Sequence, residues 1–508
     1  MPEYRIPDLV RMVERKEIDI PELQREFVWS DNQVRDLAES IYKNYPIGVI
    51  TLYKVPEECR RENERYWVLD GQQRLLSLTL IMKGHVEALI RGRLQTKRLT
   101  IYFDPKNERF EIRQPRRGEN WIELSKLLQI TDRFKLEEFL RSRGLNIDEQ
   151  IKVSTLWSRF REDVRIFVHE LPEDLDLDDL GNIFVRTNFG GTQVKGSDVY
   201  STMIAITQRD LVKELREFCT RLPIDIDYGI LIRTFIAFLT QGKVKLAGRV
   251  LDQARKLKEL LRREQSRIRT IAESVKACTE EAIRLLRDEM GIMTKRYLPT
   301  ENVIPVMAYY ISKKKNLSGE DKTGLLKWFV LASYFRRYST SAETRLNEDL
   351  STIEGGGDYK DLIKNIEKTE GDLKERIKKD IAEGKVNELL LYAILKQNDA
   401  KDFETREDLN TGNITIHHIF PKSFLISSGY ENIVDDIGNL TLITPGTNQR
   451  LSSELPENYL GRIPPEIREA HLIPNDEKLW RSENCKDFIK ERKKLLEKSV
   501  EEFFQGLY

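Results

Sequence analysis

The sequence predicts an α+β protein in which helices dominate, and two features carry this prediction. Strand-like runs alternate with helical patterns near the N-terminus and again near the C-terminus. Between them, about residues 206–395 are almost wholly helical in pattern and rich in Lys, Arg, Glu and Leu. With 508 residues, of which 40% are hydrophobic and 33% charged, the chain is long enough for several globular domains.

The N-terminal region mixes short strands with helices. Ser30 followed by Gln33 is the pattern of a capping box, and Pro46 ends the helix that this box begins. The runs "IGVITLY" and "RYWVLD" are strand-like, and the second ends at Asp70 before another helix. The predicted buried face of that helix holds Leu75, Leu78, Met82 and Val86.

The C-terminal region begins with a polar stretch and then gives a β–β–α order. The strand-like runs are "ITIHHIF" and "NLTLIT", and a turn at Pro445-Gly446 and a helical tail follow. The glycine-rich "EGGGDYKD" interrupts the helical middle. We therefore expect three domains, with the boundaries 1–205, 206–395 and 396–508.

Composition excludes several classes of protein. The 84 basic residues balance 84 acidic ones, so the chain is no dedicated nucleic-acid coat, although local basic clusters leave DNA binding open. No apolar run approaches the ~20 residues that cross a bilayer, and the N-terminus lacks the apolar core of a signal peptide. We expect a cytoplasmic protein with no membrane partner. The four scattered cysteines argue against a disulfide framework and a Cys-ligated zinc site.

Two adjacent histidines, His417 and His418, stand at the end of a strand-like run in a chain with only five histidines. Hydrolysis of a phosphodiester needs a base for water, which a neutral imidazole supplies, and charge neutralisation, which a hard divalent cation supplies. Such a cation accepts amide oxygens and an occasional imidazole, and Asn439 and Asn448 follow closely. Adjacent side chains on an ideal strand point to opposite faces, so both histidines serve one site only if the strand ends there, as Pro421 indicates.

The stretches "HHIFPKSF", "GNLTLIT" and "TNQRLSS" together resemble the ββα-metal motif of HNH endonucleases. The resemblance implies that His417 and Asn448 hold one Mg²⁺ or Mn²⁺ and that His418 is the general base. It also implies that Asn439 orients the loop and the base.

Other interpretations of these residues remain open when each is taken singly. One histidine could be a core residue and the other a surface residue, Asn439 a turn residue, and Asn448 a helix cap. Lys422 and Arg450 are further candidates, for contact with the phosphate.

The N-terminal stretch "WVLDGQQRLLSLTL" is the second unusual feature. Asp70-Gly71 between a strand and a helix makes a tight turn that presents backbone N–H groups at a helix N-terminus, which is an anion site. Gln72, Gln73 and Arg74 add amide donors and a guanidinium. The turn suits a phosphate or a nucleotide, although a strand–turn–helix junction is also a common structural element.

Two further stretches strengthen the nucleotide interpretation: "IPELQREFVWS" carries Gln24 and Arg25, and "NIFVRTNFGGTQV" carries Arg186 and Asn188. With the DGQQR turn they resemble the ParB/sulfiredoxin-like N-terminal domain of GmrSD-type, modification-dependent restriction enzymes. The resemblance implies that a nucleoside triphosphate binds at the turn and is hydrolysed there. It also implies that these four residues line the same nucleotide pocket. Arg186 and Asn188 could instead be a strand-end ion pair and a loop cap. The nearby "GTQVKGS" is no Walker A site, because Ser197 stands where Lys is required.

Both resemblances together imply a nucleotide-dependent or nucleotide-regulated DNA endonuclease that nicks modified or foreign DNA in antiviral defence. GTP, UTP, ATP and CTP are not distinguished, and a homodimer is one way to cut both strands. Within the family, "FRRYSTSAETRLNEDL" at 335–350 is expected to form a helix pair that supports the nuclease core. Two alternatives remain: a nucleotide-gated DNA-binding regulator whose nuclease site has decayed, because His417 replaces a commoner Asp, and a metal-dependent RNase or toxin.

Overall fold

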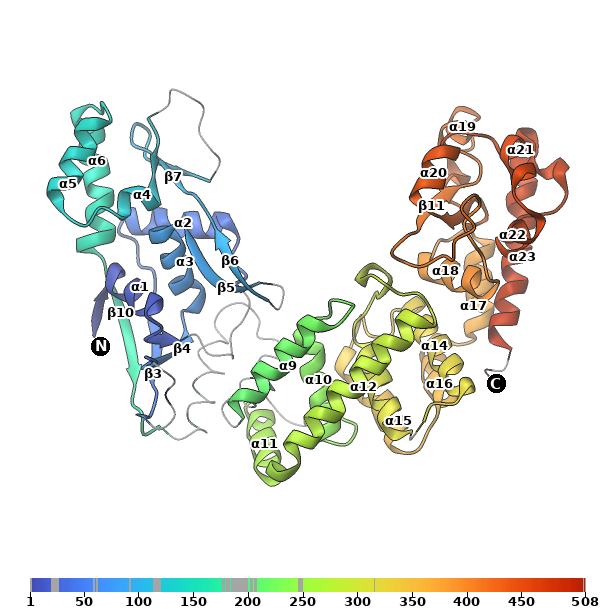
Figure 1. The fold of residues 1–508 in the computed structure, drawn as a ribbon, viewed down its shortest axis with the longest axis horizontal. Helices are drawn as coiled ribbons and strands as arrows, with labels where there is room; N and C mark the ends of the chain where they lie inside the picture. Colours follow the sequence, from blue (N-terminus) through green and yellow to red (C-terminus); the bar gives the residue numbers. More distant parts are fainter. Residues whose placement is uncertain are drawn as a thin grey trace. The chain divides into compact units, whose positions relative to one another are not determined.

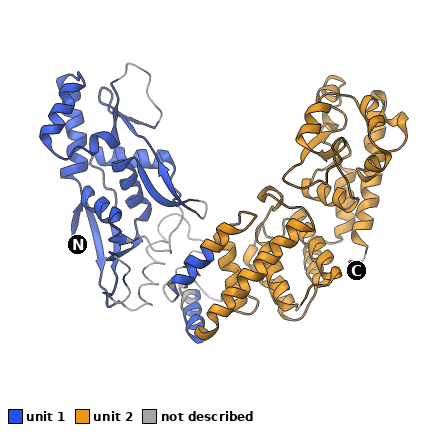
Figure 2. Cartoon of the chain, in the orientation of Figure 1, with its two compact units in different colours: residues 1–216, 247–263 blue, residues 217–246, 264–508 orange. Residues whose placement is uncertain are grey.

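The computed structural model describes residues 2–19, 27–57, 60, 63–90, 93–112, 120–175, 179, 183, 200, 201, 204, 208–244, 250–314, 316–505 and 507. The described chain is α+β and mostly helical, as the sequence predicts (Figure 1). It forms two compact units, residues 1–216 with 247–263 and residues 217–246 with 264–508 (Figure 2). The predicted three-domain boundaries stay a prediction.

The first unit is built on a five-stranded mixed sheet. Its strands, in spatial order, are β1 (Glu3–Arg5), β10 (Arg165–Leu171), β3 (Ile50–Lys54), β4 (Tyr66–Asp70) and β2 (Ile18–Asp19). Strand β10 runs parallel to β3, and β3 runs antiparallel to β4. Three helices of this unit pack together: α3 (Gln72–Lys83) contacts both α1 (Ile6–Glu14) and α2 (Asp31–Tyr42).

Smaller elements complete the first unit. The strands are β5 (His85–Ile90), β6 (Arg93–Arg98), β7 (Tyr102–Asp104), β8 (Arg109–Glu111) and β9 (Ile122–Glu123). The helices are α4 (Leu124–Leu128), α5 (Arg133–Ser142), α6 (Ile147–Ser158) and α11 (Val250–Arg263), and α9 (Arg209–Arg221) begins in this unit and ends in the second. Strands β5 and β6 form a hairpin, and β7 pairs with both β8 and β9.

Local signals in this unit are mostly confirmed. The Ser30 hydroxyl accepts from the Gln33 N–H at 3.3 Å, and the Gln33 side chain accepts from the Ser30 N–H at 2.8 Å, which completes the predicted capping box. The placement of Val86 on the following helix is wrong. Gly84 ends α3 with a φ of 78°, and Val86 lies in β5. A left-handed residue stops the helix before the apolar spacing runs out.

The middle of the chain is helical, as predicted. Its helices in the second unit are α10 (Tyr228–Leu239), α12 (Ile268–Asp288), α13 (Val303–Lys313), α14 (Gly319–Tyr334), α15 (Ala342–Glu354), α16 (Tyr359–Glu370), α17 (Leu373–Ala382) and α18 (Glu388–Gln397). The predicted helix pair at 335–350 is wrong, because only α15 forms there. Arg336 and Ser341 take positive φ values of 47° and 50°, which interrupt a helix. Arg337 turns inward instead, and its Nε lies 2.7 Å from the buried Asp349 carboxylate.

The C-terminal part has the predicted β–β–α order. Its elements are β11 (Thr415–His418), α19 (Lys422–Ser427), β12 (Leu440–Ile443), α20 (Pro445–Leu451), α21 (Pro456–Tyr459), α22 (Pro465–Ala470) and α23 (Cys485–Phe504). Strands β11 and β12 are antiparallel, and α23 packs against α17 and α18. The predicted turn at Pro445-Gly446 is wrong, because Pro445 is the first residue of α20 and Thr444 caps that helix. Among the described residues, no helix is both long and apolar enough to cross a membrane.

Candidate functional site

His417 is a buried, neutral histidine on β11. The residue is only 3% exposed. Burial lowers the pKa of His417 to about 4, although the hydrogen bond to Asn448 opposes this shift. Its Nδ1 lies 2.8 Å from Asn448 Oδ1, and its Nε2 lies 3.2 Å from the Tyr459 hydroxyl. At neutral pH the ring therefore carries a single proton, on one of its two nitrogens.

The Asn448 amide oxygen indicates which nitrogen carries that proton. An amide oxygen only accepts, so the 2.8 Å hydrogen bond requires that His417 Nδ1 donates to Asn448 Oδ1. The Tyr459 hydroxyl donates to the Ile419 carbonyl at 3.1 Å, so its oxygen could accept from Nε2–H if the ring proton moved there. His417 Nδ1 and Asn448 Oδ1 would then be two electron-pair donors that face each other.

This spacing fits a divalent cation. Two ligands at adjacent positions of an octahedral Mg²⁺, with bonds of about 2.1 Å, lie roughly 3 Å apart. The imidazole nitrogen and the amide oxygen are also acceptable donor types for Mg²⁺ and Mn²⁺. His417 and Asn448 are therefore close enough to share one cation, and their role as its ligands stays a prediction.

His418 lies next on β11 and, as expected for a strand, has a different environment. Its side chain is 18% exposed, and its Nε2 lies 2.8 Å from Asp435 Oδ1. Burial lowers the pKa of His418, while the Asp435 carboxylate opposes this shift. Lys422 Nζ also lies 3.0 Å from Asp435 Oδ1, and the pKa of Asp435 falls because it receives both of these hydrogen bonds.

Asn439 joins the two ends of the loop between β11 and β12. It is fully buried, and its Oδ1 accepts from the Phe420 N–H at 2.8 Å. Its Nδ2 donates to the Phe420 carbonyl at 3.1 Å and to the Val434 carbonyl at 3.0 Å. These bonds fix the chain just after the histidine pair and just before Asp435.

A buried carboxylate that sequence reasoning missed holds the helix of Asn448. Asp402 accepts from the Thr444 N–H at 2.7 Å and from the Thr447 hydroxyl at 2.6 Å, at the first turn of α20. Burial alone would raise the pKa of Asp402, but these hydrogen bonds outweigh it and lower the pKa to about 2. The position of Asn448 therefore depends on a residue that precedes both strands.

Helices outside the ββα element hold the turn that carries Asn439. The buried Arg492 of α23 donates to the carbonyl oxygens of Ile437, Gly438 and Leu440 at 3.1, 3.2 and 2.6 Å. The Ile437 N–H donates to the Gly384 carbonyl, between α17 and α18, at 3.1 Å. No local sequence signal pointed to these contacts, because they join distant parts of the chain.

The two predicted phosphate contacts are both paired with carboxylates. Lys422 pairs with Asp435, and Arg450 pairs with Glu404 and donates to the Thr447 hydroxyl at 3.0 Å. Either cation would have to exchange its carboxylate for a phosphate in order to contact DNA.

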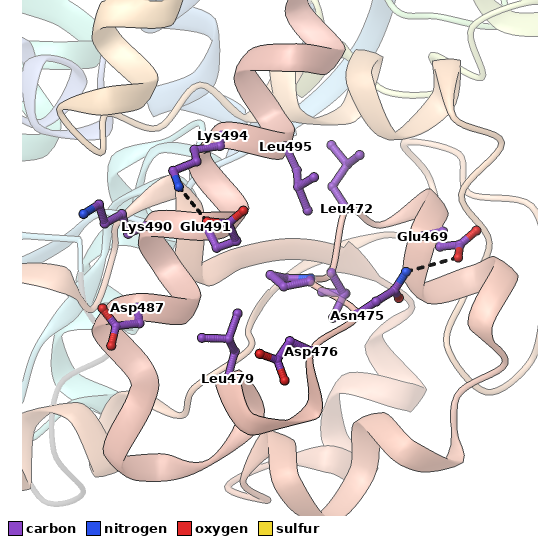
Figure 3. Close-up of a pocket in the computed structure, with 12 residues that line it drawn as sticks. Glu469, Leu472, Asn475, Asp476, Leu479, Asp487, Lys490, Glu491, Lys494 and Leu495 are labelled. Carbon is purple, nitrogen blue, oxygen red and sulfur yellow. Dashed lines mark hydrogen bonds and ion pairs between the residues drawn. The ribbon is translucent and has the colours of Figure 1, made fainter.

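A separate cleft of about 670 Å³ is lined on one side by residues of the segment 469–479 and on the other by residues 487–495 of α23 (Figure 3). Leu472 and Leu479 line it, as does the ion pair of Lys494 with Glu491 at 2.8 Å. The residues lining this cleft do not include either histidine or either asparagine of the predicted site. It is therefore distinct from the candidate nuclease site.

The N-terminal turn has the predicted strand–turn–helix form. Asp70 ends β4, and Gly71 precedes α3 with a φ of 90°. A Cβ at Gly71 would lie 3.0 Å from Ile50 Cγ1, so the position favours glycine both sterically and by its backbone angle. Arg74 donates from Nη2 to Asp70 Oδ2 and from Nη1 to the Ile47 carbonyl, both at 3.1 Å.

Gln73 connects the turn to another predicted stretch. Its Oε1 accepts from the Val28 N–H at 3.0 Å and from the Trp29 N–H at 3.3 Å. Gln72 is half-buried in the first turn of α3. Predicted nucleotide-site residues that lie outside the described residues are Gln24, Arg25, Arg186 and Asn188.

Comparison with known proteins gives two matches to family models. Residues 6–204 match the N-terminal domain of the GmrSD restriction endonucleases, and residues 367–498 match the C-terminal domain of the same enzymes. The chain has the architecture of a GmrSD-type restriction endonuclease. The resemblance to GmrSD-type enzymes that was inferred from the DGQQR turn is thereby confirmed at the level of the family, and the HNH identity of the histidine pair stays a prediction.

This GmrSD-type chain is also similar over most of its length to an uncharacterized protein of Methanocaldococcus jannaschii. The two are 23% identical over 530 residues, which cover 92% of this chain and 88% of the relative. The DGQQR turn lies within the N-terminal match, and the histidine pair lies within the C-terminal match. Family membership thus supports a restriction endonuclease with DNA as its substrate.

Proposed function

We propose that this GmrSD-type protein is a metal-dependent endonuclease that cuts modified or foreign DNA, under the control of a nucleoside triphosphate. The observation that carries the nuclease part is the 2.8 Å approach of His417 Nδ1 to Asn448 Oδ1, beside a second histidine with a carboxylate partner. Antiviral defence is the role that such an activity would serve.

His417 and Asn448 would hold the metal ion. A bound Mg²⁺ or Mn²⁺ would supply positive charge at the phosphate and at the leaving 3′-oxygen. Mg²⁺ keeps several water ligands and often takes phosphate oxygens, so two ligands from the protein are a reasonable share of its coordination. The low pKa of His417 keeps its ring neutral, as a ligand must be.

His418 would act as the general base. Burial lowers its pKa, so the ring is neutral at pH 7 and can take a proton from the attacking water. Asn439 would keep the loop in register with this base through its three hydrogen bonds. One such site cuts one strand per visit, so a single copy would nick DNA. A double-strand break would then need two visits or a homodimer.

The DGQQR turn would bind the triphosphate. It offers backbone N–H groups at the start of the 12-residue helix α3, next to the paired Arg74 and Asp70. An incoming phosphate would compete with Asp70 for the Arg74 guanidinium, which binds phosphates as readily as carboxylates. GTP, UTP, ATP and CTP all carry the triphosphate that this turn would recognise.

The test is cleavage of phage DNAs that carry different modifications, with and without Mg²⁺ or Mn²⁺ and each of the four triphosphates. Unmodified plasmid DNA is the reference. We expect metal-dependent cutting of modified DNA, and a loss on the order of 10³-fold in His418→Ala with nucleotide hydrolysis retained. His85→Ala, at an exposed histidine of the first unit, is the control and should cut normally.

Three results would contradict the proposal. Normal cutting by His418→Ala would place the base elsewhere. Preference for RNA over DNA would favour the RNase interpretation. DNA binding without any cutting, under all of these conditions, would favour a regulator with a decayed site.

A further inference from the structure

We infer that Asp435 is a positioning residue for the general base: its carboxylate holds the His418 ring so that the other ring nitrogen faces the water to be deprotonated. This inference rests on the proposed nuclease function. It concerns a residue outside the histidines and asparagines of the motif.

The contacts of Asp435 are its first support. A single oxygen, Oδ1, lies 2.8 Å from His418 Nε2 and 3.0 Å from Lys422 Nζ. Within the part of the chain that the structure describes, no other partner of the carboxylate is recorded. Its side chain is 68% exposed, so it adds little to the stability of the fold. What this carboxylate does is orient two side chains that come from β11 and α19.

The backbone around Asp435 is fixed on both sides, which makes this orientation reproducible. The Val434 carbonyl accepts from Asn439 Nδ2 at 3.0 Å. The Asp436 carboxylate pairs with Lys493 Nζ at 2.5 Å and accepts from the Gly438 N–H at 2.8 Å. Both neighbours are thus anchored to buried structure, while the Asp435 side chain alone points to the exposed side with His418.

The direction of the hydrogen bond determines which nitrogen can react. A carboxylate accepts only, so His418 Nε2 must donate its proton to Asp435. Nδ1 then carries the lone pair, and it has no hydrogen-bond partner among the described residues. The proton of the attacking water would pass to Nδ1, and the hydroxide oxygen would form the new bond to phosphorus as the 3′-oxygen leaves. Without Asp435 the ring could rotate, or could place its proton on Nδ1, and either change removes the base.

The ion pair of Lys422 with Asp435 matters when DNA binds. A DNA phosphate would compete with Asp435 for the Lys422 ammonium. When that exchange takes place, Asp435 retains His418 as its partner. The histidine would therefore keep its orientation while the lysine moves to the substrate.

The test compares Asp435→Ala and Asp435→Asn in the full chain, by steady-state nicking of modified DNA. Asn keeps an oxygen that can accept from Nε2, whereas Ala does not. We expect kcat to fall by about 10- to 100-fold in Asp435→Ala. We expect KM for DNA to change by less than about threefold, and kcat of Asp435→Asn to stay within about threefold of wild type.

Glu491→Ala is the matched control, because Glu491 forms an exposed ion pair with Lys494 at 2.8 Å in the same unit. It should leave kcat and KM unchanged, and thermal unfolding of all variants should confirm that each is folded. A kcat of Asp435→Ala equal to wild type would overturn the inference. Recovery of Asp435→Ala by excess Mn²⁺, or an Asn variant as slow as the Ala variant, would also overturn it, since the residue would then act by charge or as a metal ligand. If the wild-type chain cuts no DNA, the proposed function fails and this inference fails with it. If wild type cuts and Asp435→Ala cuts equally well, the inference alone fails.

Discussion

In each of the two candidate sites, an amide side chain connects parts of the backbone, and the two sites differ in which parts are connected. Asn439 is fully buried and makes three hydrogen bonds to the backbone at both ends of one loop. Gln73 is half-buried and accepts from Val28 and Trp29, in a segment that precedes it by 45 and 44 residues. Asn439 thus fixes a single loop, whereas Gln73 joins two separate segments. Under the proposed function, the fixed loop would keep the base in place for chemistry on a phosphodiester, and the turn would exchange partners when a nucleotide binds.

The largest expected difference between the sites is in stability. Asn439→Ala should lower the free energy of unfolding of its unit by about 4 kcal/mol, because three buried backbone groups lose their partner. Gln73→Ala should cost only about 1 kcal/mol, because water can reach the groups that it leaves. Scanning calorimetry of the full chain measures both, and Asn439→Asp should cost at least as much as Asn439→Ala, because a buried carboxylate would face the Phe420 and Val434 carbonyl oxygens. Equal costs for Asn439→Ala and Gln73→Ala would break the comparison.

The next largest difference is expected in how acid changes the free energy of unfolding of the two units. His471 of the second unit is fully buried, and burial lowers its pKa to about 4, whereas His85 and His169 of the first unit are exposed. An unfolded histidine takes its proton near pH 6.5, so below that pH the unfolded state binds more protons than the folded state. The free energy of unfolding is therefore highest above about pH 6.5 and falls as the pH is lowered toward 4. The share of this loss that is due to His471 is about 3 kcal/mol.

Urea unfolding between pH 7 and pH 4 measures this loss. The variant His471→Gln should weaken the pH dependence, to which the buried His417 also contributes because its pKa is about 4 as well, and His85→Gln should leave it unchanged. An unchanged pH dependence in His471→Gln would show that the buried ring is not the acid-sensitive group.

The smallest of these effects is expected at the DGQQR turn. Arg74→Ala should reduce nucleotide hydrolysis on the order of 10²-fold, because the guanidinium would stabilise the phosphate charge. This loss corresponds to about 2.7 kcal/mol at 1.36 kcal/mol per tenfold. Lys43→Ala is the matched control, since Lys43 pairs with Glu39 four residues before it at 2.5 Å, as Arg74 pairs with Asp70. Unchanged hydrolysis in Arg74→Ala would mean that the turn is a structural corner.

The sequence predicts those features that are local. The capping box at Ser30, the strand that ends at Asp70 and the β–β–α order around His417 all depend on residues close together in the chain, and the structure contains each of them. The predictions that failed concern where elements end. Gly84 stops a helix whose apolar spacing continues to Val86, because a left-handed backbone overrides periodicity.

The residues that support the histidine site could not be predicted in this way. Asp402 binds the Thr444 N–H across 42 residues, and Arg492 binds the Leu440 carbonyl across 52 residues. In the sequence, Arg492 lies in a run of Lys, Arg and Glu that is typical of a solvated helix face. Its burial, which lowers its pKa to about 9, becomes evident only when α23 is packed against the turn 437–439 that precedes β12.

The Gly384 carbonyl, which accepts from the Ile437 N–H, has a genetic consequence. Gly384 has a φ of 77°, and a Cβ there would collide with the Asp436 carboxylate. Any side chain at this position would therefore displace the Asp436 carboxylate, which accepts from the Gly438 N–H in the turn that carries Asn439, although Gly384 lies between two helices and far from the histidines in sequence. Under the proposed function, a screen of random mutants for loss of DNA cutting should recover changes at Gly384 alongside changes at His418. Such a mutant would map outside the ββα element and still be defective in cutting.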